Sequence, residues 1–441
     1  MPKPKLFHAR ALVTSNEKHE VFDDAFLAIE EDKILDCGPW KKHPQSKSFS
    51  IEELPHGMIA PGLFNLHTHL PMSLLKGIVE DVNLHSWLFD TIFPTEEKWV
   101  SPHFVRVGAE LALCECIRSG VTYVGDMYYY CDEIASAVDQ AGLRGMIAKS
   151  IFDHGGMDTK SLDESLEVAI RLHKKFLTHP RIQIALAPHA PYTCSPDTLR
   201  RASMIAKELN LPMMIHLAET KKEADDIQKK WGQSPTEYLE KSGLLNSKNV
   251  LLAHSIWLED SDYKLLSKPN ITCVLNPQSN AKLGSGLPPV NKMIDRGVRF
   301  AMGTDGSASN NNLDIFSELN FFSKAHHLVV GDLKSLPGPR LFDAATRKAA
   351  EAVGLGKELG SLEAGKQADF IVIDLKTPHL TPLTHPYSHL IYSVQGPDVQ
   401  DLYVAGKCLM KNRKIRSLDE ENILKKAEHL WKQIARGLSE N

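Results

Sequence analysis

The alternation of hydrophobic and polar positions changes character twice along the chain. Up to about residue 55, short alternating apolar segments are separated by polar turns, which is typical of strands in a small sheet. From about residue 58, short apolar runs alternate with longer helical patterns, which indicates βα units and a parallel sheet. Strand patterns return near residue 368, and a closing amphipathic helix is predicted over residues 418–438.

Eight apolar runs in the central region are predicted to form the strands of one barrel. Eight strands alternating with helices over about 270 residues match a (β/α)8 TIM barrel better than an open doubly wound sheet. No Gly-x-Gly-x-x-Gly sequence opens the first helix, which further argues against a dinucleotide-binding fold. The predicted strands are residues 58–66, 121–126, 142–150, 182–188, 212–217, 250–254, 271–276 and 298–303.

Both ends of the chain have a strand character that the middle lacks. Short strands from opposite ends of a chain can complete one sheet, so we expect a single small β domain assembled from both termini. The predicted ranges are 1–57 for its N-terminal part, 58–364 for the barrel, and 365–441 for its C-terminal part with the closing helix. The predicted fold class is therefore α/β, a barrel with a small β domain.

Composition and charge exclude several classes of binding partner. Lys and Arg total 51 against 55 Asp and Glu, a formal net charge of -4 without long runs of one sign, which argues against nucleic-acid and anionic-membrane partners. No apolar stretch approaches the ~20 residues that span a bilayer, and no apolar region follows the N-terminus as in a secretory signal. The seven cysteines lack the spacing of a disulfide framework or a zinc ribbon, so we expect a soluble, reduced, cytoplasmic protein.

Histidine and aspartate recur at the carboxyl ends of the predicted strands. His67 and His69 end the first strand, and residues i and i+2 of a strand project from the same face. In a TIM barrel these strand ends form the mouth where active sites are built. Any one of these residues alone would more often be a hydrogen-bonded structural group than a ligand, but six of the eight predicted strands end in His or Asp. The other strand ends carry Asp126, His189, His216, His254 and Asp305.

These strand-end residues predict a metal site. His67, His69 and His216 supply three imidazoles and Asp305 a carboxylate, a ligand set that suits Zn²⁺ or Fe²⁺. Such an ion lowers the pKa of a bound water from about 16 toward ~7 and provides a nucleophile at neutral pH. Asp305 is also able to accept the proton from that water.

Two further residues are predicted to move protons. Glu219 follows His216 by three residues, just past the fifth strand, and is free to shuttle a proton between water and substrate. His254 ends the sixth strand and is placed to orient the attacking water. Hydrolytic removal of an amine from a ring carbon requires such groups, because a ring nitrogen must be protonated and ammonia must leave protonated. The alternative for Glu219 is a solvated carboxylate that caps the next helix.

Four segments together resemble the amidohydrolase superfamily, and within it the 5′-methylthioadenosine/S-adenosylhomocysteine deaminases. The resemblance extends from about residue 20 to residue 412. It is highly specific for the superfamily and less so for the substrate. The segments are PGLFNLHTH at 61–69, HLAE at 216–219, AH at 253–254 and GTDGSASN at 303–310.

The resemblance implies a distorted (β/α)8 barrel with a β-sandwich formed by both termini. It implies one divalent metal ion, with Zn²⁺ expected and Fe²⁺ or Mn²⁺ accepted by the same ligands, and proton transfer by Glu219 and His254. Two-metal branches of the superfamily carry a carbamylated Lys where this chain has His189, so a mononuclear site is expected. The implied ligands are His67, His69, His216 and Asp305.

The resemblance also implies residues that bind the substrate. Glu96 resembles the glutamate that holds the ribose hydroxyls, and a carboxylate accepting two hydroxyl protons suits a vicinal diol. His189 resembles the histidine that contacts the purine, and Trp87 is expected against the nucleoside or the thioether. Lys149 stands where some relatives have an Arg that reaches the amino-acid tail of S-adenosylhomocysteine, and it lacks the bidentate fork of Arg. A solvated strand-end charge is the alternative for Lys149.

The predicted activity is an aminohydrolase that converts the 6-amino group of an adenine nucleoside thioether to the inosine form with release of ammonia. Methylthioadenosine is favoured over S-adenosylhomocysteine. The alternatives are a guanine or pterin deaminase, a triazine chlorohydrolase, or a non-catalytic scaffold barrel. Retention of Glu219 favours a deaminase, Glu96 with His189 favours a nucleoside, and the complete ligand set argues against a scaffold. A homo-oligomer, dimer or tetramer, is expected from the resemblance only.

Overall fold

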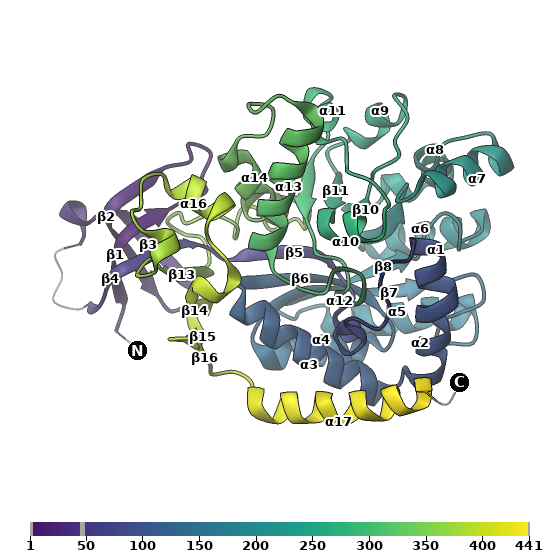
Figure 1. Ribbon diagram of the computed structural model, residues 1–441, viewed down its shortest axis with the longest axis horizontal. Helices are drawn as coiled ribbons and strands as arrows, with labels where there is room; N and C mark the ends of the chain where they lie inside the picture. The colour runs from purple at the N-terminus through teal and green to yellow at the C-terminus, as the bar shows by residue number, and fades with distance from the viewer. Residues whose placement is uncertain (1–2, 45–48, 440–441) are drawn as a thin grey trace. The chain divides into compact units, whose positions relative to one another are not determined.

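The computed structural model describes residues 3–44 and 49–439, and its central feature is a parallel sheet nearly closed into a barrel (Figure 1). The eight strands are hydrogen-bonded in their order along the chain, from β5 to β12. This confirms the predicted (β/α)8 barrel. The strands are β5 (Leu63–Thr68), β6 (Val121–Tyr128), β7 (Arg144–Ile151), β8 (Ile182–Pro188), β9 (Met213–Leu217), β10 (Val250–His254), β11 (Ile271–Leu275) and β12 (Phe300–Met302).

Helices follow the barrel strands, as the alternating pattern predicts. Most of them are amphipathic, and their apolar residues are buried. In chain order the helices are α1 (Leu84–Ser86), α2 (Phe93–Trp99), α3 (Pro102–Arg118), α4 (Cys131–Ala141), α5 (Leu162–Phe176), α6 (Pro196–Leu209), α7 (Lys221–Trp231), α8 (Pro235–Lys241), α9 (Asp262–Leu266), α10 (Pro277–Lys282), α11 (Val290–Asp295), α12 (Ser307–Asn310), α13 (Ile315–Val330), α14 (Gly338–Ala344), α15 (Arg347–Ala352), α16 (Pro386–Tyr392) and α17 (Glu420–Ser439).

Polar side chains join the first and last strands of the barrel. The Asn65 amide donates to the Thr304 hydroxyl over 2.7 Å, and the Thr304 backbone N–H donates to Asn65 Oδ1 over 2.9 Å. Beside them, the Asp305 N–H donates to the carbonyl of His67 over 2.9 Å. These bonds link the end of β12 to β5, and they fix Asp305 next to His67.

The first predicted strand, residues 58–66, is wrong in its limits because the apolar run belongs to two strands. Strand β4 (Ser50–Pro61) lies in a second sheet, and β5 begins at Leu63 in the barrel. Between them, a Cβ on Gly62 would lie 2.3 Å from Thr122 Cγ2, so only glycine fits at this change of direction. The seven other predicted strands agree with β6–β12 to within two residues at each end.

The second sheet takes four strands from each end of the chain, which confirms the predicted separate β region built from both termini. Strand β4 pairs antiparallel with β13, joining Met58 to Ile373 and Ala60 to Ile371. The aromatic ring of Phe370 stacks on that of Tyr403 with centroids 4.4 Å apart. The sheet order is β16 (Lys414–Ile415), β15 (Lys407–Lys411), β14 (Val399–Val404), β13 (Phe370–Asp374), β4, β1 (Lys5–Val13), β2 (Val21–Glu30) and β3 (Lys33–Pro39).

The described chain forms two compact units that differ from the predicted domain ranges. One unit comprises the chain up to Phe64 with Cys114–Tyr123 and Asp314–Leu418, and the other comprises Asn65–Leu113, Val124–Leu313 and the chain from Asp419. The closing helix α17 thus groups with the barrel strands, where Lys98 donates to the carbonyl of Gly437 over 2.8 Å. Among the helices of the described residues, none has the length and apolar character needed to cross a membrane.

Candidate active site

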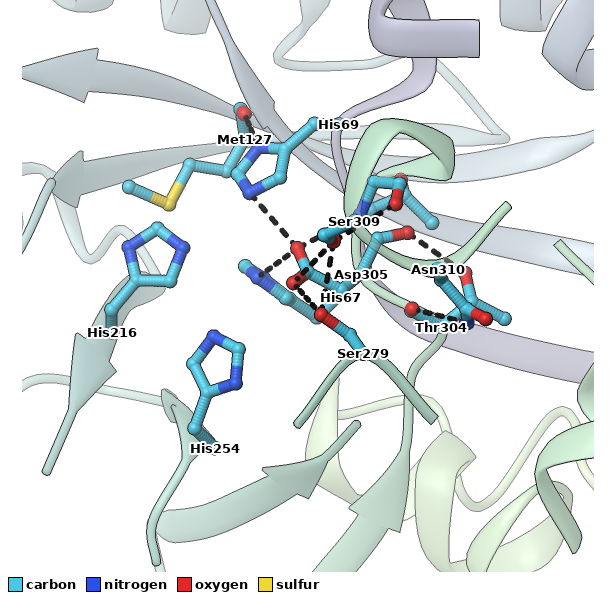
Figure 2. Close-up of polar contacts among 12 residues, drawn as sticks. His67, His69, Met127, His216, His254, Ser279, Thr304, Asp305, Ser309 and Asn310 are labelled. Carbon is cyan, nitrogen blue, oxygen red and sulfur yellow. Dashed lines mark hydrogen bonds and ion pairs between the residues drawn. The ribbon is translucent and has the colours of Figure 1, made fainter. Parts of the chain in front are cut away.

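Four imidazoles and one carboxylate converge at the carboxyl ends of the barrel strands (Figure 2). The ring centroids of His67 and His69, from β5, lie 4.9 Å apart, and that of His216, from β9, lies 4.9 Å from His67. His254, from β10, lies 5.4 Å from His216. Potential ligand atoms of His67, His69 and Asp305 all lie within 4.8 Å of one another, as do those of His67, His216 and His254.

The surroundings of His67 fit a metal ligand, because its Nε2 lies 3.5 Å from Asp305 Oδ1 in an ion-pair contact without hydrogen-bond geometry. The His67 imidazole is fully buried, and neither ring nitrogen has a hydrogen-bond partner among the described residues. His69 Nδ1 donates to the Met127 carbonyl over 2.6 Å, and His216 Nδ1 donates to the His189 carbonyl over 2.7 Å. A neutral imidazole that donates through Nδ1 keeps a lone pair on Nε2, which is the arrangement of metal-binding histidines.

Burial and the Asp305 carboxylate set the protonation of these imidazoles. Burial lowers the pKa of His67 to about 4 and lowers that of His216 well below its usual value, so both are neutral. Burial also lowers the pKa of His69, but its contact with Asp305, 3.3 Å between Nε2 and Oδ1, outweighs this and raises the pKa to about 9. A metal ion that bound His69 would therefore displace a proton from it.

Asp305 is held by donors on every side. Its Oδ2 accepts hydrogen bonds from Ser279 Oγ over 2.7 Å and from Ser309 Oγ over 3.0 Å, and its Oδ1 accepts one from the Gly306 N–H over 2.8 Å. Burial raises its pKa, but the adjacent His67 and His69 outweigh burial and hold the pKa well below the usual value. Asp305 is therefore a fixed anion beside the imidazoles.

Glu219 lies beyond the end of β9, next to His254. Its Oε2 lies 3.6 Å from His254 Nε2, and its Oε1 accepts a weak hydrogen bond from Ser285 Oγ over 3.4 Å. The side chain is buried, and burial raises the pKa of its carboxyl group. A carboxyl group with a raised pKa is able to hold a proton and release it during a reaction.

Sequence reasoning missed Glu223, which holds the backbone of this turn. Its two carboxylate oxygens accept hydrogen bonds from the N–H groups of Ala218 and Glu219, each over 2.9 Å. Ala218 has a φ of +48°, which L residues rarely adopt. The sequence did contain a signal for this role. Thr220 is followed three residues later by Glu223, the spacing of a capping box, in which the glutamate accepts a hydrogen bond from a backbone N–H at the start of a helix.

A cavity lined by several aromatic side chains shares its wall with the imidazole cluster. Trp87 begins a π-helical turn, Trp87–Ile92, and lines the cavity, as does Glu96 of α2. Glu96 is 1% exposed and accepts a hydrogen bond from the Tyr128 hydroxyl over 2.5 Å. Burial raises its pKa to about 7. Both residues were predicted from the sequence, whereas Tyr128 was not, although it stands just after Asp126 at the end of β6.

His189 follows β8 and lines the same cavity. Its ring stacks on Phe152 with centroids 4.8 Å apart and 24° between the planes, and its Nδ1 bonds with Thr193 Oγ1 over 2.9 Å. Burial lowers its pKa to about 3, so the imidazole is neutral. Phe152, which the sequence did not single out, lines the same cavity and holds the His189 ring by this stacking.

The structure does not bring Lys149 to this cavity, contrary to its predicted role in substrate binding. Side chains alternate along β7, so that Ser150 lines the cavity while Lys149 points elsewhere. The Lys149 ammonium is fully buried and lies 2.7 Å from Asp158 Oδ1 and 2.9 Å from the Ser150 carbonyl oxygen. The solvated alternative is also wrong, because the charge is paired inside the protein.

Comparisons with known proteins find relatives that match most of the chain. A 5-methylthioadenosine/S-adenosylhomocysteine deaminase of Thermodesulfovibrio yellowstonii is 36% identical, covering 98% of each chain. A 5'-deoxyadenosine deaminase of Methanosphaera stadtmanae is 37% identical, covering 85% of this chain and 87% of its own. The crystal structure of an adenosine deaminase from Xanthomonas campestris with bound zinc has a TM-score of 0.94 and 33% identity, covering 98% of each chain.

The sequence pattern of the amidohydrolase family matches residues 58–409. This range contains the barrel strands together with the whole imidazole cluster and Asp305. The resemblance noted in the sequence is confirmed, and the chain belongs to the amidohydrolase family.

Proposed function

We propose that this protein is a metal-dependent hydrolytic deaminase of adenine nucleosides with a modified 5′ position, 5′-methylthioadenosine and S-adenosylhomocysteine among them. One observation carries the proposal: the buried, protonatable Glu219 stands beside the cluster of imidazoles at the inner end of an aromatic cavity that also holds Glu96. The three relatives named above act on nucleosides that share adenine and differ at the 5′ carbon. The shared adenine and ribose agree with a site that binds the base and the ribose.

The proposed metal ligands are His67, His69, His216 and Asp305. Three nitrogens and one oxygen suit Zn²⁺, the ion named for the Xanthomonas campestris structure, and Fe²⁺ or Mn²⁺ accept the same set. When bound, the ion supplies Lewis-acid activation of water. The ion is assigned to this place because the buried nitrogens of His67 make no hydrogen bond among the described residues and Nε2 already lies 3.5 Å from the Asp305 carboxylate.

The protein residues supply the proton transfers. Glu219 takes a proton from the attacking water and gives one to N1 of the purine as the new C6–O bond forms. His254 accepts a hydrogen bond from the water through Nε2 and so orients it. Glu219 then takes the remaining proton from the C6 hydroxyl and delivers it to the amino group, so that the C6–N bond breaks, a carbonyl forms at C6 and ammonia leaves. Its distance of 3.6 Å from His254 leaves both groups within reach of one water.

Four cavity residues are proposed to hold the nucleoside. Glu96, once ionised, accepts the two hydroxyl protons of the ribose. His189 with Phe152 offers a stacking surface to the purine, and Trp87 packs against the 5′ substituent. Because Asp158 engages Lys149, no lysine at this strand end is available for the carboxylate of S-adenosylhomocysteine, so methylthioadenosine is the better substrate.

The absorbance change from adenine to hypoxanthine tests this function. Zinc-loaded protein is offered methylthioadenosine, S-adenosylhomocysteine and adenosine, with guanine and a chlorotriazine in parallel. Glu219→Gln is expected to lower kcat by about 10²–10⁴-fold, because the amide carries no transferable proton. Asp225→Asn, the same change at an exposed position of α7, should leave kcat unaltered. Turnover of guanine or the chlorotriazine without turnover of any adenine nucleoside would reject the proposal.

A further inference from the structure

The end of β11 supplies neither a predicted ligand nor a predicted acid or base, unlike most of the other barrel strands. It continues into α10 and a turn, and residues 279–285 of this region bring polar atoms to the cluster. Ser279, Asn280 and Ser285 are all buried. We call residues 279–285 the β11 turn.

Asn280 contacts His254 directly. Its Oδ1 lies 2.7 Å from His254 Nδ1, and both side chains are buried. An amide oxygen is able only to accept a hydrogen bond, so Nδ1 of His254 carries the proton. The proton-free nitrogen of the neutral imidazole is then Nε2, the atom that faces Glu219.

His254 needs such a partner because its backbone is strained. His254 has a φ of +71° and Ser255 a φ of +51°, two consecutive left-handed residues that are not glycine. A side chain leaving such a backbone is directed away from the course of a regular strand. The contact with Asn280 fixes the ring in that direction.

The same turn also reaches Glu219. Ser285 Oγ donates to Glu219 Oε1 over 3.4 Å. The main chain of Ser285 is itself held, because its N–H donates to the Asn280 carbonyl over 2.8 Å and its carbonyl accepts from Trp257 Nε1 over 2.8 Å. Asn280 and Ser285 are therefore parts of one rigid turn.

We propose that the β11 turn positions the proton-transfer pair, with Asn280 holding His254 as the Nδ1–H tautomer and Ser285 holding the carboxyl group of Glu219. The inference rests on the proposed function for the roles of His254 and Glu219. It adds positioning residues that do not touch the substrate: they keep the acceptor nitrogen of His254 and the carboxyl group of Glu219 turned toward one water.

Kinetics of Asn280→Leu test the positioning of His254. Leucine has a similar size but no acceptor, so kcat for methylthioadenosine should fall about 10²-fold, the loss typical of a misplaced catalytic group, while KM stays near the wild-type value. Asn422→Leu is the matched control, because it makes the same change at an exposed position of α17, and it should keep the wild-type kcat. A wild-type kcat in Asn280→Leu would overturn the proposal.

Nitrogen-15 spectra of the histidine rings give an independent reading. The His254 signals are identified by their absence from the spectrum of His254→Gln. In the zinc-loaded wild-type protein these signals should show a protonated Nδ1 and an unprotonated Nε2. The opposite tautomer in wild type would overturn the proposal, whatever the kinetics. If no adenine nucleoside is converted, the proposed function fails, but these spectra still decide the tautomer.

Ser285→Ala tests the second contact and serves if Asn280→Leu does not fold. Loss of this weak hydroxyl donor should lower kcat about two- to threefold without raising KM, the lower end of what one hydrogen bond contributes. An unchanged kcat in Ser285→Ala would remove Ser285 from the proposal.

Discussion

The buried ion pair between Lys149 and Asp158 provides a sharp test of how the structure assigns these residues. Lys149→Met keeps the length of the side chain and removes its charge. The Asp158 side chain is 5% exposed, so the variant leaves a carboxylate in the interior, and among the described residues the Tyr130 N–H, 2.8 Å from Oδ2, is its remaining donor. We expect the structure to lose stability, with little direct effect on the substrate.

The size of the loss follows from the burial of the pair. Removing one partner of a buried ion pair typically costs about 3–5 kcal/mol, because the remaining charge is uncompensated. The Tyr130 N–H bond survives, so the lower end, about 3 kcal/mol, is expected here. In a large domain each kcal/mol lowers Tm by about 2–4 °C, which gives a fall of about 6–12 °C.

The assay is thermal unfolding of wild type, Lys149→Met and Lys149→Met/Asp158→Asn, with KM measured for both thioether nucleosides. The double variant removes the uncompensated charge and should recover part of the lost Tm. An unchanged Tm in Lys149→Met, together with a KM that rises only for S-adenosylhomocysteine, would refute this reasoning. It would restore Lys149 as a substrate-binding residue.

Three further outcomes are expected. The KM for nucleosides should rise as the pH falls through about 7, because the Glu96 carboxyl group, with its raised pKa, takes up a proton there and ceases to accept the ribose hydroxyls. A Glu96→Gln variant whose KM still rose in this pH range would contradict the assignment. A chelator should abolish activity and lower Tm, and Zn²⁺ should restore both, since ligand at 1,000 times its Kd stabilises by about 4 kcal/mol; full activity with no metal found by elemental analysis would refute the metal site. Asn65→Leu leaves the Thr304 N–H and hydroxyl without their partner, so the free energy of unfolding should fall by about 1–3 kcal/mol for each group left unpaired. A Tm equal to that of wild type would show that these bonds do not hold the barrel closed.

The barrel was predictable because its strands are marked at both ends in the sequence. Apolar runs such as Val250–His254 are bounded by turn residues and closed by a polar side chain, and the structure places those polar ends at one mouth. The first strand was misplaced because the run from Met58 to Leu66 is apolar on both sides of Gly62. The hydrophobicity of this run does not show that β4 and β5 belong to different sheets. The break between them is marked by Pro61-Gly62 alone.

Side chains that act through other side chains were harder to predict. His67, His69, His216 and Asp305 could be grouped because their chemistry is unusual at strand ends. Asn280 and Lys149 carry no such mark. Their partners, His254 and Asp158, lie 26 and 9 residues away in the chain, and the course of the intervening loops decides these contacts. Lys149 illustrates the limit, because a charge at a strand end is compatible with a ligand, a solvated group or a buried pair until its neighbours are known.

The bonds that join β5 to the end of β12 have a consequence for how the site comes into being during synthesis. Asn65 and Thr304 are 239 residues apart, and the metal-ligand candidates next to them, His67 and Asp305, are separated by nearly the whole barrel. A nascent chain in which β12 and Asp305 are not yet synthesised holds three of the four candidate ligands, the histidines, but lacks the carboxylate. With the proposed ligands, tight metal binding is expected only after β12 has joined the barrel, and a bound ion would stabilise finished molecules selectively over partly made ones.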